Sequence, residues 1–273
     1  MIKKLFNQAL GLNLLRKSLG KDIFYQAAKE DLRLKISDQP QNFLPPQKEH
    51  AKILVLSPHA DDDAFGMGGT IIKHAKAGDE VSVLYFCDGS KGTPEGIRDS
   101  SLIGKRKNEA ERAAKILGAK ELLFWGYKDG SLSANSTSVK ALKSLILENK
   151  PDIIYLPSLS DNHPDHLETN KIFYQVLASF SSDSPFKFPL VAMYELWTPL
   201  FPNRLINITS VIEIKKEAIS QHQSQLRSRN YSEAILALNK YRAEMNGIKG
   251  YAEAFFVISS DIYKKLFELV WKK

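Results

Sequence analysis

Histidine and aspartate side chains crowd two short segments of the chain. One segment reads SPHADDD at positions 57–63, and the other reads DNHPDH at positions 161–166. Histidine and carboxylate groups are the usual ligands of catalytic zinc, which keeps three of them and leaves an open position for water. The same ligand types with open positions also suit Fe(II). The two segments together therefore indicate a metal centre that could activate water for hydrolysis.

The spacing inside each segment favours convergence on one ion. His59 and Asp62 stand three residues apart on a turn that leads into a helix, so both can reach one ion. His163 and His166 present two further imidazoles, at least one of which should complete the ligand set. Each pattern alone is weak, because acidic residues also cap helix N-termini. Their occurrence directly after two of the predicted strands makes the metal interpretation the stronger one.

The elements that must position these residues follow a β–α alternation from residue 52 onward. Short apolar runs predict strands at 53–56, 80–87, 122–125, 153–156, 190–195 and 205–208. Helices are predicted at 65–77, 101–117, 139–148, 167–180, 213–225 and 232–245. This alternation predicts a Rossmann-like α/β fold, with a mostly parallel sheet and helices on both faces. Loops that follow parallel strands emerge at one edge of the sheet, so the two histidine-rich segments should face one another there.

The first 48 residues differ from the rest, which divides the chain into an N-terminal extension at 1–48 and one main domain at 49–273. In the extension, leucines recur at helical spacing among basic residues, at positions 5, 12, 15 and 19. This helix could pack on the main domain or lie on an anionic membrane surface, and packing is the more common use of such a pattern. Prolines at 40, 45 and 46 then predict a linker.

Composition limits the class of protein and its partners. The chain has 273 residues, 43% of them hydrophobic, which is typical of a globular protein with a sizeable core. The net charge of +7 comes without an arginine-rich run, so nucleic acid is not an expected partner. Cys87 is the one cysteine, which excludes an intramolecular disulfide, and it is expected to be a small buried residue. No apolar run reaches 18 residues and no cleavable signal is evident. We therefore expect a cytoplasmic protein, with peripheral contact at the inner face of the membrane as the alternative.

Both segments resemble the signature motifs of the LmbE-like, or PIG-L, family of zinc-dependent N-acetylglucosamine deacetylases. HADDD at 59–63, with glycines at 66, 68 and 69, is similar to the family's A-H-P-D-D-E…G-x-G-G, and HPDH at 163–166 is similar to its second motif. Further similarities are found in RKNE at 106–109, GYKDG at 126–130, HQSQ at 222–225 and YAEAF at 251–255. The last two are similar to stretches in bacterial members tied to surface-polysaccharide synthesis. The resemblance spans about residues 50–258.

This resemblance implies an activity and a role for each site residue. The activity is removal of the acetyl group from an N-acetylglucosamine-type sugar, carried by a glycolipid, a lipid-linked precursor or a polysaccharide precursor. The metal would be Zn²⁺, with Fe²⁺ also suited to the ligands. The implied residues are the metal ligands His59, Asp62 and His166, the general base Asp61, a protonated His163 that stabilises the oxyanion, and the sugar-hydroxyl contacts Arg106 and Asp129. Nothing in the sequence sets an oligomeric state.

Two positions depart from the family motif. Ala60 stands where the family has proline and Asp63 where it has glutamate, which affects the surroundings of the metal and bears on its affinity. Two rival functions are a non-haem Fe(II) enzyme and a carbohydrate-binding protein without activity. The β–α alternation argues against the first, which would favour an antiparallel double-sheet scaffold. The intact Asp61 argues against the second, because a binding protein needs no base beside its metal ligands.

Other candidate residues give weaker indications. The glycines in GMGG at 66–69 are expected to serve close helix packing rather than nucleotide binding. Trp125, Tyr194 and Trp197 could form a sugar-stacking wall, although such aromatic residues equally belong to cores. The histidines outside the two segments are expected to be surface or packing residues; they are His50, His74 and His222.

Overall fold

The computed structural model describes residues 34–43, 50–93, 97–181, 184–227 and 230–271. The helix expected near the N-terminus lies outside these ranges, and so does most of the linker. From the N-terminal extension the structure describes strand β1 (Lys35–Ser37) and the short 3-10 helix η1 (Pro40–Phe43). Within the described ranges, no helix has both the length and the apolar character needed to cross a lipid bilayer.

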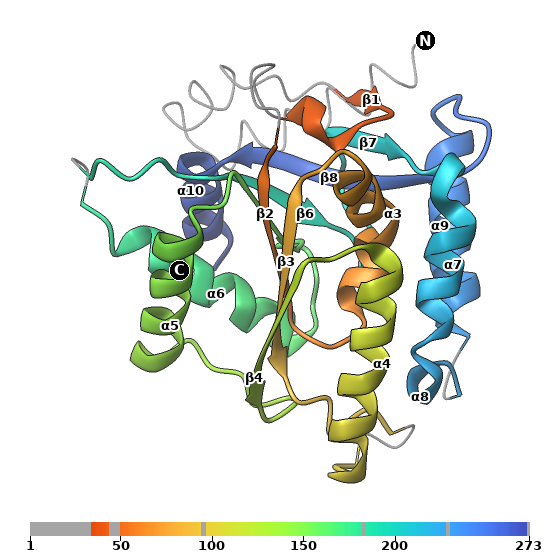
Figure 1. Cartoon of the computed structure of the whole chain (residues 1–273). Helices are drawn as coiled ribbons and strands as arrows, with labels where there is room; N and C mark the ends of the chain where they lie inside the picture. Colours follow the sequence, from red (N-terminus) through yellow and green to blue (C-terminus); the bar gives the residue numbers. More distant parts are fainter. Residues whose placement is uncertain (1–33, 44–49, 94–96, 182–183, 228–229, 272–273) are drawn as a thin grey trace.

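An eight-stranded sheet forms the centre of the described structure, in the order β1-β7-β8-β6-β5-β2-β3-β4 (Figure 1). Its other strands are β2 (Lys52–Ser57), β3 (Glu80–Cys87), β4 (Glu121–Tyr127), β5 (Ile153–Pro157), β6 (Leu190–Tyr194), β7 (Arg204–Asn207) and β8 (Ala252–Ser259). Neighbouring strands pair in parallel except at β8, which is antiparallel to both β6 and β7. The predicted mostly parallel sheet is therefore confirmed.

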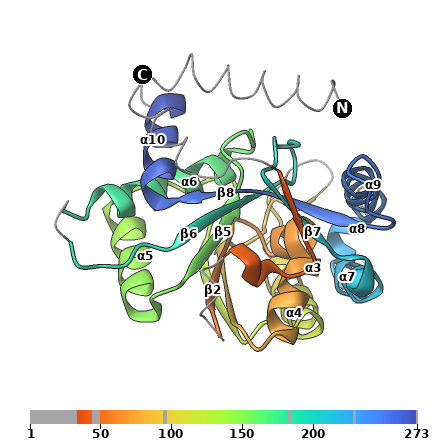
Figure 2. The same cartoon turned by 90° about the horizontal axis from the view of Figure 1, so that it is seen from above.

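Helices cover both faces of the sheet, as Figures 1 and 2 show. One face carries α3 (Asp62–Lys76), α4 (Ser101–Leu117), α7 (Ile212–Ser220), the short α8 (Gln223–Leu226) and α9 (Tyr231–Glu244). The other face carries α5 (Ser136–Asn149), α6 (Pro164–Ala178) and α10 (Ser260–Trp271). The central strands are apolar on both sides: Val55 belongs to the core on the α3 side, and Leu54 and Leu56 belong to the core on the α6 side.

The chain changes its direction of winding between β2 and β5. These two strands lie side by side at the centre of the sheet, with Ile53 opposite Ile153. Helix α3 follows β2 onto one face, and α6 follows β5 onto the other (Figure 1). Open parallel sheets bind ligands outside the carboxyl ends of their strands at such a switch point. The segments at 57–63 and 161–166 therefore lie where this fold forms its sites.

Three elements differ from the prediction. The helix expected at 213–225 is two helices, because the chain leaves helical geometry at His222 (φ −81°, ψ 50°) and α8 then begins. The Glu109 carboxylate on α4 fixes this new start by accepting hydrogen bonds from the backbone N–H and the Oγ of Ser224 (3.0 and 2.6 Å). The sequence pattern also misses β8, in which the charged Glu253 interrupts the apolar run, and the helix α10 that follows it.

Helix α3 is broken near its start, at Met67, whose φ of −145° and ψ of 21° are not helical. A fully buried ion pair lies at the break, with Lys215 Nζ 2.7 Å from Glu253 Oε1. Lys215 also donates a hydrogen bond to the carbonyl oxygen of Phe65 (3.0 Å), at the end of the first turn. Carbonyl groups at a helix end lack partners within the helix. The ammonium group therefore caps the short turn that carries Asp62.

The Glu253 carboxylate caps the helix on the other side of the break. It accepts hydrogen bonds from the backbone N–H groups of Gly69 (2.8 Å) and Thr70 (2.7 Å), where the second stretch of α3 begins. N–H groups at a helix start lack partners within the helix and attract negative charge. The glycines here also let the helix approach the sheet closely, because a Cβ on Gly66 would lie 2.6 Å from the Tyr194 ring. This contact supports the interpretation of the glycines as packing residues.

Replacing Lys215 by methionine should destabilise the fold by about 3–5 kcal/mol, because the Glu253 carboxylate is then buried without its partner. The matched control is Lys216→Met. This neighbouring lysine pairs with Glu213 at the surface (Nζ to Oε1 2.7 Å), and loss of a surface pair costs at most about 1 kcal/mol. Urea unfolding of both variants measures the difference. Equal free energies of unfolding would show that the buried pair does not hold α3.

Candidate metal centre

The turn between β2 and α3 positions His59 and Asp62, and both side chains are buried. The backbone N–H of His59 donates to Asp62 Oδ2 (2.8 Å), and Ser57 Oγ donates to the carbonyl oxygen of His59 (2.7 Å). The turn is thus closed by its own side chains. These bonds fix the backbone from which the His59 ring projects.

His166 comes from the first turns of α6, after β5. The helix begins at Pro164, since the fixed φ of proline suits the first helical position. His163 caps this helix by accepting a hydrogen bond at Nδ1 from the backbone N–H of Asp165 (3.3 Å). The His163 ring lies 4.9 Å from the His166 ring and 4.7 Å from the His59 ring, measured between centroids. The fold therefore brings together the two segments that sequence reasoning singled out.

The Asp62 carboxylate lies between the two histidines expected to bind the metal. Asp62 Oδ2 is 3.1 Å from His59 Nδ1 and 3.2 Å from His166 Nε2. Bonds of about 2.0–2.1 Å to a tetrahedral zinc would place two ligand atoms about 3.3 Å apart. The two separations that involve Asp62 therefore match the spacing of two ligand atoms on one metal ion.

Two further groups of donor atoms also contain His59. Nitrogen atoms of His59, His163 and His166 lie within 4.8 Å of one another, and so do donor atoms of His59, Cys87 and Asp165. Burial raises the pKa of the Cys87 thiol, which keeps the thiol protonated and makes it a poor ligand. The Nδ1 of His163 is engaged by the Asp165 N–H, which leaves Nε2 as its nitrogen for further contacts.

Carboxylates on the far side of the imidazoles orient both rings. His59 Nε2 lies 3.2 Å from Asp165 Oδ2 and 3.4 Å from Asp129 Oδ1, which leaves Nδ1 for a metal. His166 Nδ1 lies 3.1 Å from Asp161 Oδ2, which leaves Nε2. Such partners fix the tautomer and direction of metal-binding histidines. Sequence reasoning gave Asp161 and Asp165 no role, although their place beside His166 in the second motif is the signal that could have found one.

Mutual attraction sets the charges within this cluster. Burial alone would lower the pKa of His59, but the Asp62 charge and the carboxylates of Asp129 and Asp165 raise it well above its usual value. The Asp62 charge likewise outweighs burial at His166 and raises its pKa to about 9. Burial would raise the pKa of Asp62, yet the two imidazoles hold it well below its usual range. Asp62 is therefore ionised, as a ligand must be, and a divalent cation would take the place of the imidazole protons.

His166 gives the most direct indication that the cluster suits a cation. Its ring is fully buried, and within the described residues neither ring nitrogen makes a hydrogen bond of good geometry, although the carboxylates of Asp62 and Asp161 lie near. A buried polar atom without a hydrogen bond is costly. A metal ion at Nε2 would remove that cost for one of the two nitrogens, so the residues present fit a divalent metal.

Arg106, on α4, contacts the expected base. Its Nη2 lies 3.1 Å from Asp61 Oδ1, and its Nη1 donates to the carbonyl oxygen of Gly89 (3.1 Å). Burial raises the pKa of Asp61, and the Arg106 guanidinium opposes that rise without cancelling it. A fixed orientation and a raised pKa both suit a general base. The sugar contact expected of Arg106 stays a prediction.

The loop after β4 reaches into the site through Asp129. Its Oδ2 accepts a hydrogen bond from the Lys91 backbone N–H (3.1 Å), and its pKa falls to about 2 because the hydrogen bond with His59 outweighs burial. The next residue, Gly130, donates its N–H to Asp165 Oδ2 (2.7 Å). The loop therefore contacts His59 and Asp165 on the side away from Asp62. The sugar contact expected of Asp129 also stays a prediction.

The residues that depart from the family motif are both buried. Asp63 Oδ2 accepts a hydrogen bond from the Tyr85 hydroxyl on β3 (3.0 Å), and burial raises the pKa of Asp63 to about 7. The shorter acid thus ties the start of α3 to the sheet. Ala60 packs among the core residues between β2 and α3.

The other histidines lie outside this cluster, as expected. His74 is fully buried between Asp79 (Nδ1 to Oδ2 2.6 Å) and Tyr155 (Nε2 to hydroxyl 2.8 Å), which makes it a packing residue. His222 is also buried, and burial lowers its pKa to about 3. His50 is exposed.

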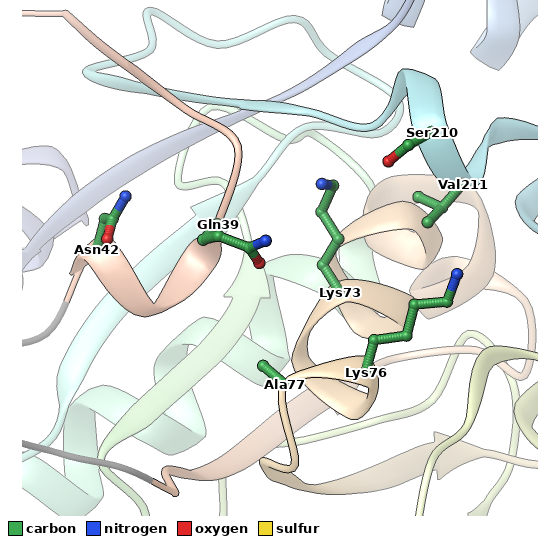
Figure 3. Close-up of a pocket in the computed structure, with 7 residues that line it drawn as sticks. All are labelled: Gln39, Asn42, Lys73, Lys76, Ala77, Ser210 and Val211. Carbon is green, nitrogen blue, oxygen red and sulfur yellow. The ribbon is translucent and has the colours of Figure 1, made fainter.

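A separate cavity of about 430 Å³ lies at the other end of α3 (Figure 3). It is lined by Gln39, Asn42, Lys73, Lys76, Ala77, Ser210 and Val211. At a rise of 1.5 Å per residue, Lys76 is about 20 Å along the helix from Asp62. Lysines at this end also suit the negative pole of the helix. The cavity is therefore not part of the candidate metal centre.

Known proteins resemble this chain in sequence and in fold. Residues 54–177, which contain both motifs, match the family described as PIG-L, GlcNAc-PI de-N-acetylase. The diacetylchitobiose deacetylase of Thermococcus kodakarensis is 30% identical over 195 residues, which cover 66% of this chain and 72% of the relative. A probable N-acetyl-alpha-D-glucosaminyl L-malate deacetylase 2 of Bacillus anthracis is 26% identical over 193 residues, which cover 65% of this chain and 83% of the relative.

A solved structure agrees over most of the chain. The N,N'-diacetylchitobiose deacetylase from Pyrococcus horikoshii, in complex with an inhibitor, has a TM-score of 0.70 at 26% identity and covers 90% of this chain and 94% of its own. The fold and the site define an α/β protein with metal-donor side chains at the switch point of its sheet. The chain belongs to the PIG-L, or LmbE-like, family. The family predicted from the two motifs is thereby confirmed.

Replacing Asp62 by asparagine should abolish metal binding, because the neutral amide removes the carboxylate that lies between the two imidazoles. His163→Ala should keep the metal, since the three converging ligand atoms are untouched. Metal per chain after dialysis, measured by atomic emission, separates the two variants.

The remaining donor group consists of His59, Cys87 and Asp165. Its control is Cys87→Ala, which should also keep the metal. Loss of the metal in His163→Ala, with retention in Asp62→Asn, would replace the proposed ligand set by the three histidines.

Proposed function

We propose that this chain is a metal-dependent deacetylase that hydrolyses the acetamide of an N-acetylglucosamine-type sugar. The observation that carries the proposal is an acid paired with Arg106, Asp61, which lies next to two imidazoles that flank one carboxylate. The names of the relatives support it, since they describe deacetylases of diacetylchitobiose and of N-acetylglucosaminyl malate. Zinc is the proposed metal, and Fe²⁺ suits the same donors.

His59, Asp62 and His166 would hold the ion. Zinc there would supply Lewis-acid chemistry, polarising the substrate carbonyl and acidifying a water molecule. Asp165 and Asp161 would keep the two imidazoles in the tautomers that present Nδ1 and Nε2 to the ion.

Asp61 would move the proton. It accepts a proton from the attacking water at its carboxylate and later donates it to the leaving amine. Its raised pKa favours both steps, because a stronger base takes the proton more readily and still releases it to an amine. Arg106 Nη2, 3.1 Å from Asp61 Oδ1, would hold the carboxylate in one orientation throughout.

His163 would stabilise the oxyanion as a neutral donor rather than as the protonated group suggested by the motif. Its Nδ1 accepts the Asp165 N–H, so the ring hydrogen sits on Nε2. Burial and the neighbouring His59 and His166 lower its pKa, which also favours the neutral ring. A fixed N–H aimed at the developing charge stabilises an oxyanion without a change of protonation.

The rival functions find less support. The parallel sheet is not the antiparallel double-sheet scaffold that favours a non-haem Fe(II) oxygenase. A binding protein would have no use for the buried pair of Asp61 and Arg106 beside its metal ligands. The membrane contact predicted from the N-terminal helix and the +7 charge stays a prediction, because that helix lies outside the described residues. The cytoplasmic location expected from the lack of a long apolar run and of a cleavable signal also stays a prediction.

Asp61→Asn should reduce acetate release by about a hundred- to ten-thousand-fold, because the amide keeps the size of the side chain but cannot accept a proton. The metal should stay bound, since no ligand is changed. The measurements are acetate released from N,N'-diacetylchitobiose and metal per chain. Near-normal turnover would remove Asp61 from the mechanism, whereas joint loss of metal and turnover would make it a ligand.

A further inference from the structure

One indole lies exposed beside the metal centre. The Trp197 side chain is 45% exposed, and its ring lies 6.5 Å from the His163 ring with an angle of 25° between the planes. The other two aromatic residues of the expected sugar-stacking wall do not join it. Tyr194 is fully buried, and Trp125 packs against Phe86 on the opposite face of the sheet.

A second ring supports the indole from behind. The Tyr231 ring, at the start of α9, meets Trp197 edge-on at 5.3 Å, and Phe65 of α3 lies 6.1 Å from Tyr231. Edge-to-face contacts of this kind stabilise aromatic pairs beyond the area they bury. The Trp197 ring is therefore held by a row of rings that extends into the core, while part of its surface stays open to solvent.

The backbone of Trp197 is tied to the metal motif. Its N–H donates to Asp161 Oδ2 (3.3 Å), the oxygen that lies 3.1 Å from His166 Nδ1. The next residue, Thr198, donates from Oγ1 to the Asn162 side chain (3.1 Å). Both bonds join the loop after β6 to the segment 161–166, so the indole keeps a fixed distance from the metal ligands.

The far side of the same loop is anchored by a buried charge. The Glu195 carboxylate accepts hydrogen bonds from the Leu200 backbone N–H (3.1 Å) and from Arg242 Nε (2.9 Å). Arg242 Nη2 also donates to the Leu200 carbonyl oxygen (2.7 Å). The loop is thus fixed at both ends, which holds an exposed apolar ring in place before any ligand binds. Such preorganisation is characteristic of binding sites.

The position of the ring identifies what it can bind. A carbonyl oxygen held by His163 Nε2 would lie about 3 Å from that nitrogen, and the group that carries the acetamide must extend outward from there. The Trp197 ring, 6.5 Å from the His163 ring and nearly parallel to it, is an exposed surface within reach of that group. A pyranose ring has C–H-rich faces that pack on aromatic rings and hydroxyl edges that stay in water. An open-chain amine has no such face.

We propose that Trp197, supported by Tyr231, is the stacking platform for the acetylated pyranose ring, and that it makes the enzyme select sugar acetamides over open-chain ones. This inference rests on the proposed function. Stacking holds the ring equally in the ground state and the transition state, so loss of the platform acts on KM and leaves kcat largely unchanged.

The test uses the full chain and two probes with the same acetamide, N,N'-diacetylchitobiose and N-acetylethanolamine. Trp197→Ala should raise KM for the sugar roughly tenfold and leave kcat/KM for the open-chain amide unchanged. Trp197→Phe should recover most of the loss. Phe201→Ala is the matched control, because this neighbouring ring is 89% exposed, and it should change neither substrate.

Binding of the sugar to Asp61→Asn with and without Trp197→Ala, measured by calorimetry, separates this inference from the proposed function. A roughly tenfold rise in Kd supports the platform even if no acetate is released by the wild-type chain. Equal affinity of the two variants, or no binding to either, overturns it. Equal loss on both probes in the kinetic assay also overturns it, because the ring would then serve the amide rather than the sugar.

Discussion

The buried pair of Lys215 and Glu253 is the interaction on which the metal centre depends. The stretch 62–66 is only about one helical turn long before the break at Met67, and a single turn is not stable alone because helix nucleation is costly. Lys215 from α7 caps that turn. Glu253 from β8 accepts a hydrogen bond from the Gly69 N–H, where the next stretch of α3 begins. Two buried charges are tolerated only when they are paired and fully hydrogen-bonded, which the contacts to helix groups achieve here. The turn that carries Asp62 is thus held by elements 150 and 184 residues further along the chain.

Charge balance explains why so many acids gather at one sheet edge. Five carboxylates lie within the site, and all are buried: Asp61, Asp62, Asp129, Asp161 and Asp165. They outnumber the single guanidinium of Arg106, so the surplus must be met by protons on the imidazoles or by a cation. The surplus of negative charge raises the pKa values of His59 and His166, so that both rings bind protons more tightly. A divalent ion would balance the same negative charge while both imidazoles stay neutral, and neutral imidazoles are the form that binds metals.

The sequence predicts the parts of this structure that depend on neighbours in the chain. Strands such as β2 and β5 are buried on both faces, so their unbroken apolar runs mark them clearly. His59 and Asp62 could be found because three residues on one turn set their separation. The partners of Arg106 and Glu109 could not be predicted in this way. Both residues lie on α4, and Arg106 meets Asp61 and Glu109 meets Ser224 only because the helices and the sheet pack together. The break in α3 could not be predicted from local sequence for the same reason, because the residues that stabilise it lie in α7 and β8.

Asp161 joins the two halves of the site. Its Oδ1 accepts the backbone N–H of His163 (3.0 Å), while its Oδ2 lies beside His166 Nδ1 and accepts the N–H of Trp197. One buried carboxylate therefore contacts a proposed metal ligand, the backbone of the proposed oxyanion donor and the loop that carries the exposed indole. Because these three groups share one anchor, a shift of the loop would also disturb the imidazoles. The spacing between the proposed oxyanion donor and the exposed indole is thus set by the protein before substrate arrives, so that a sugar bound to both needs little rearrangement of the site.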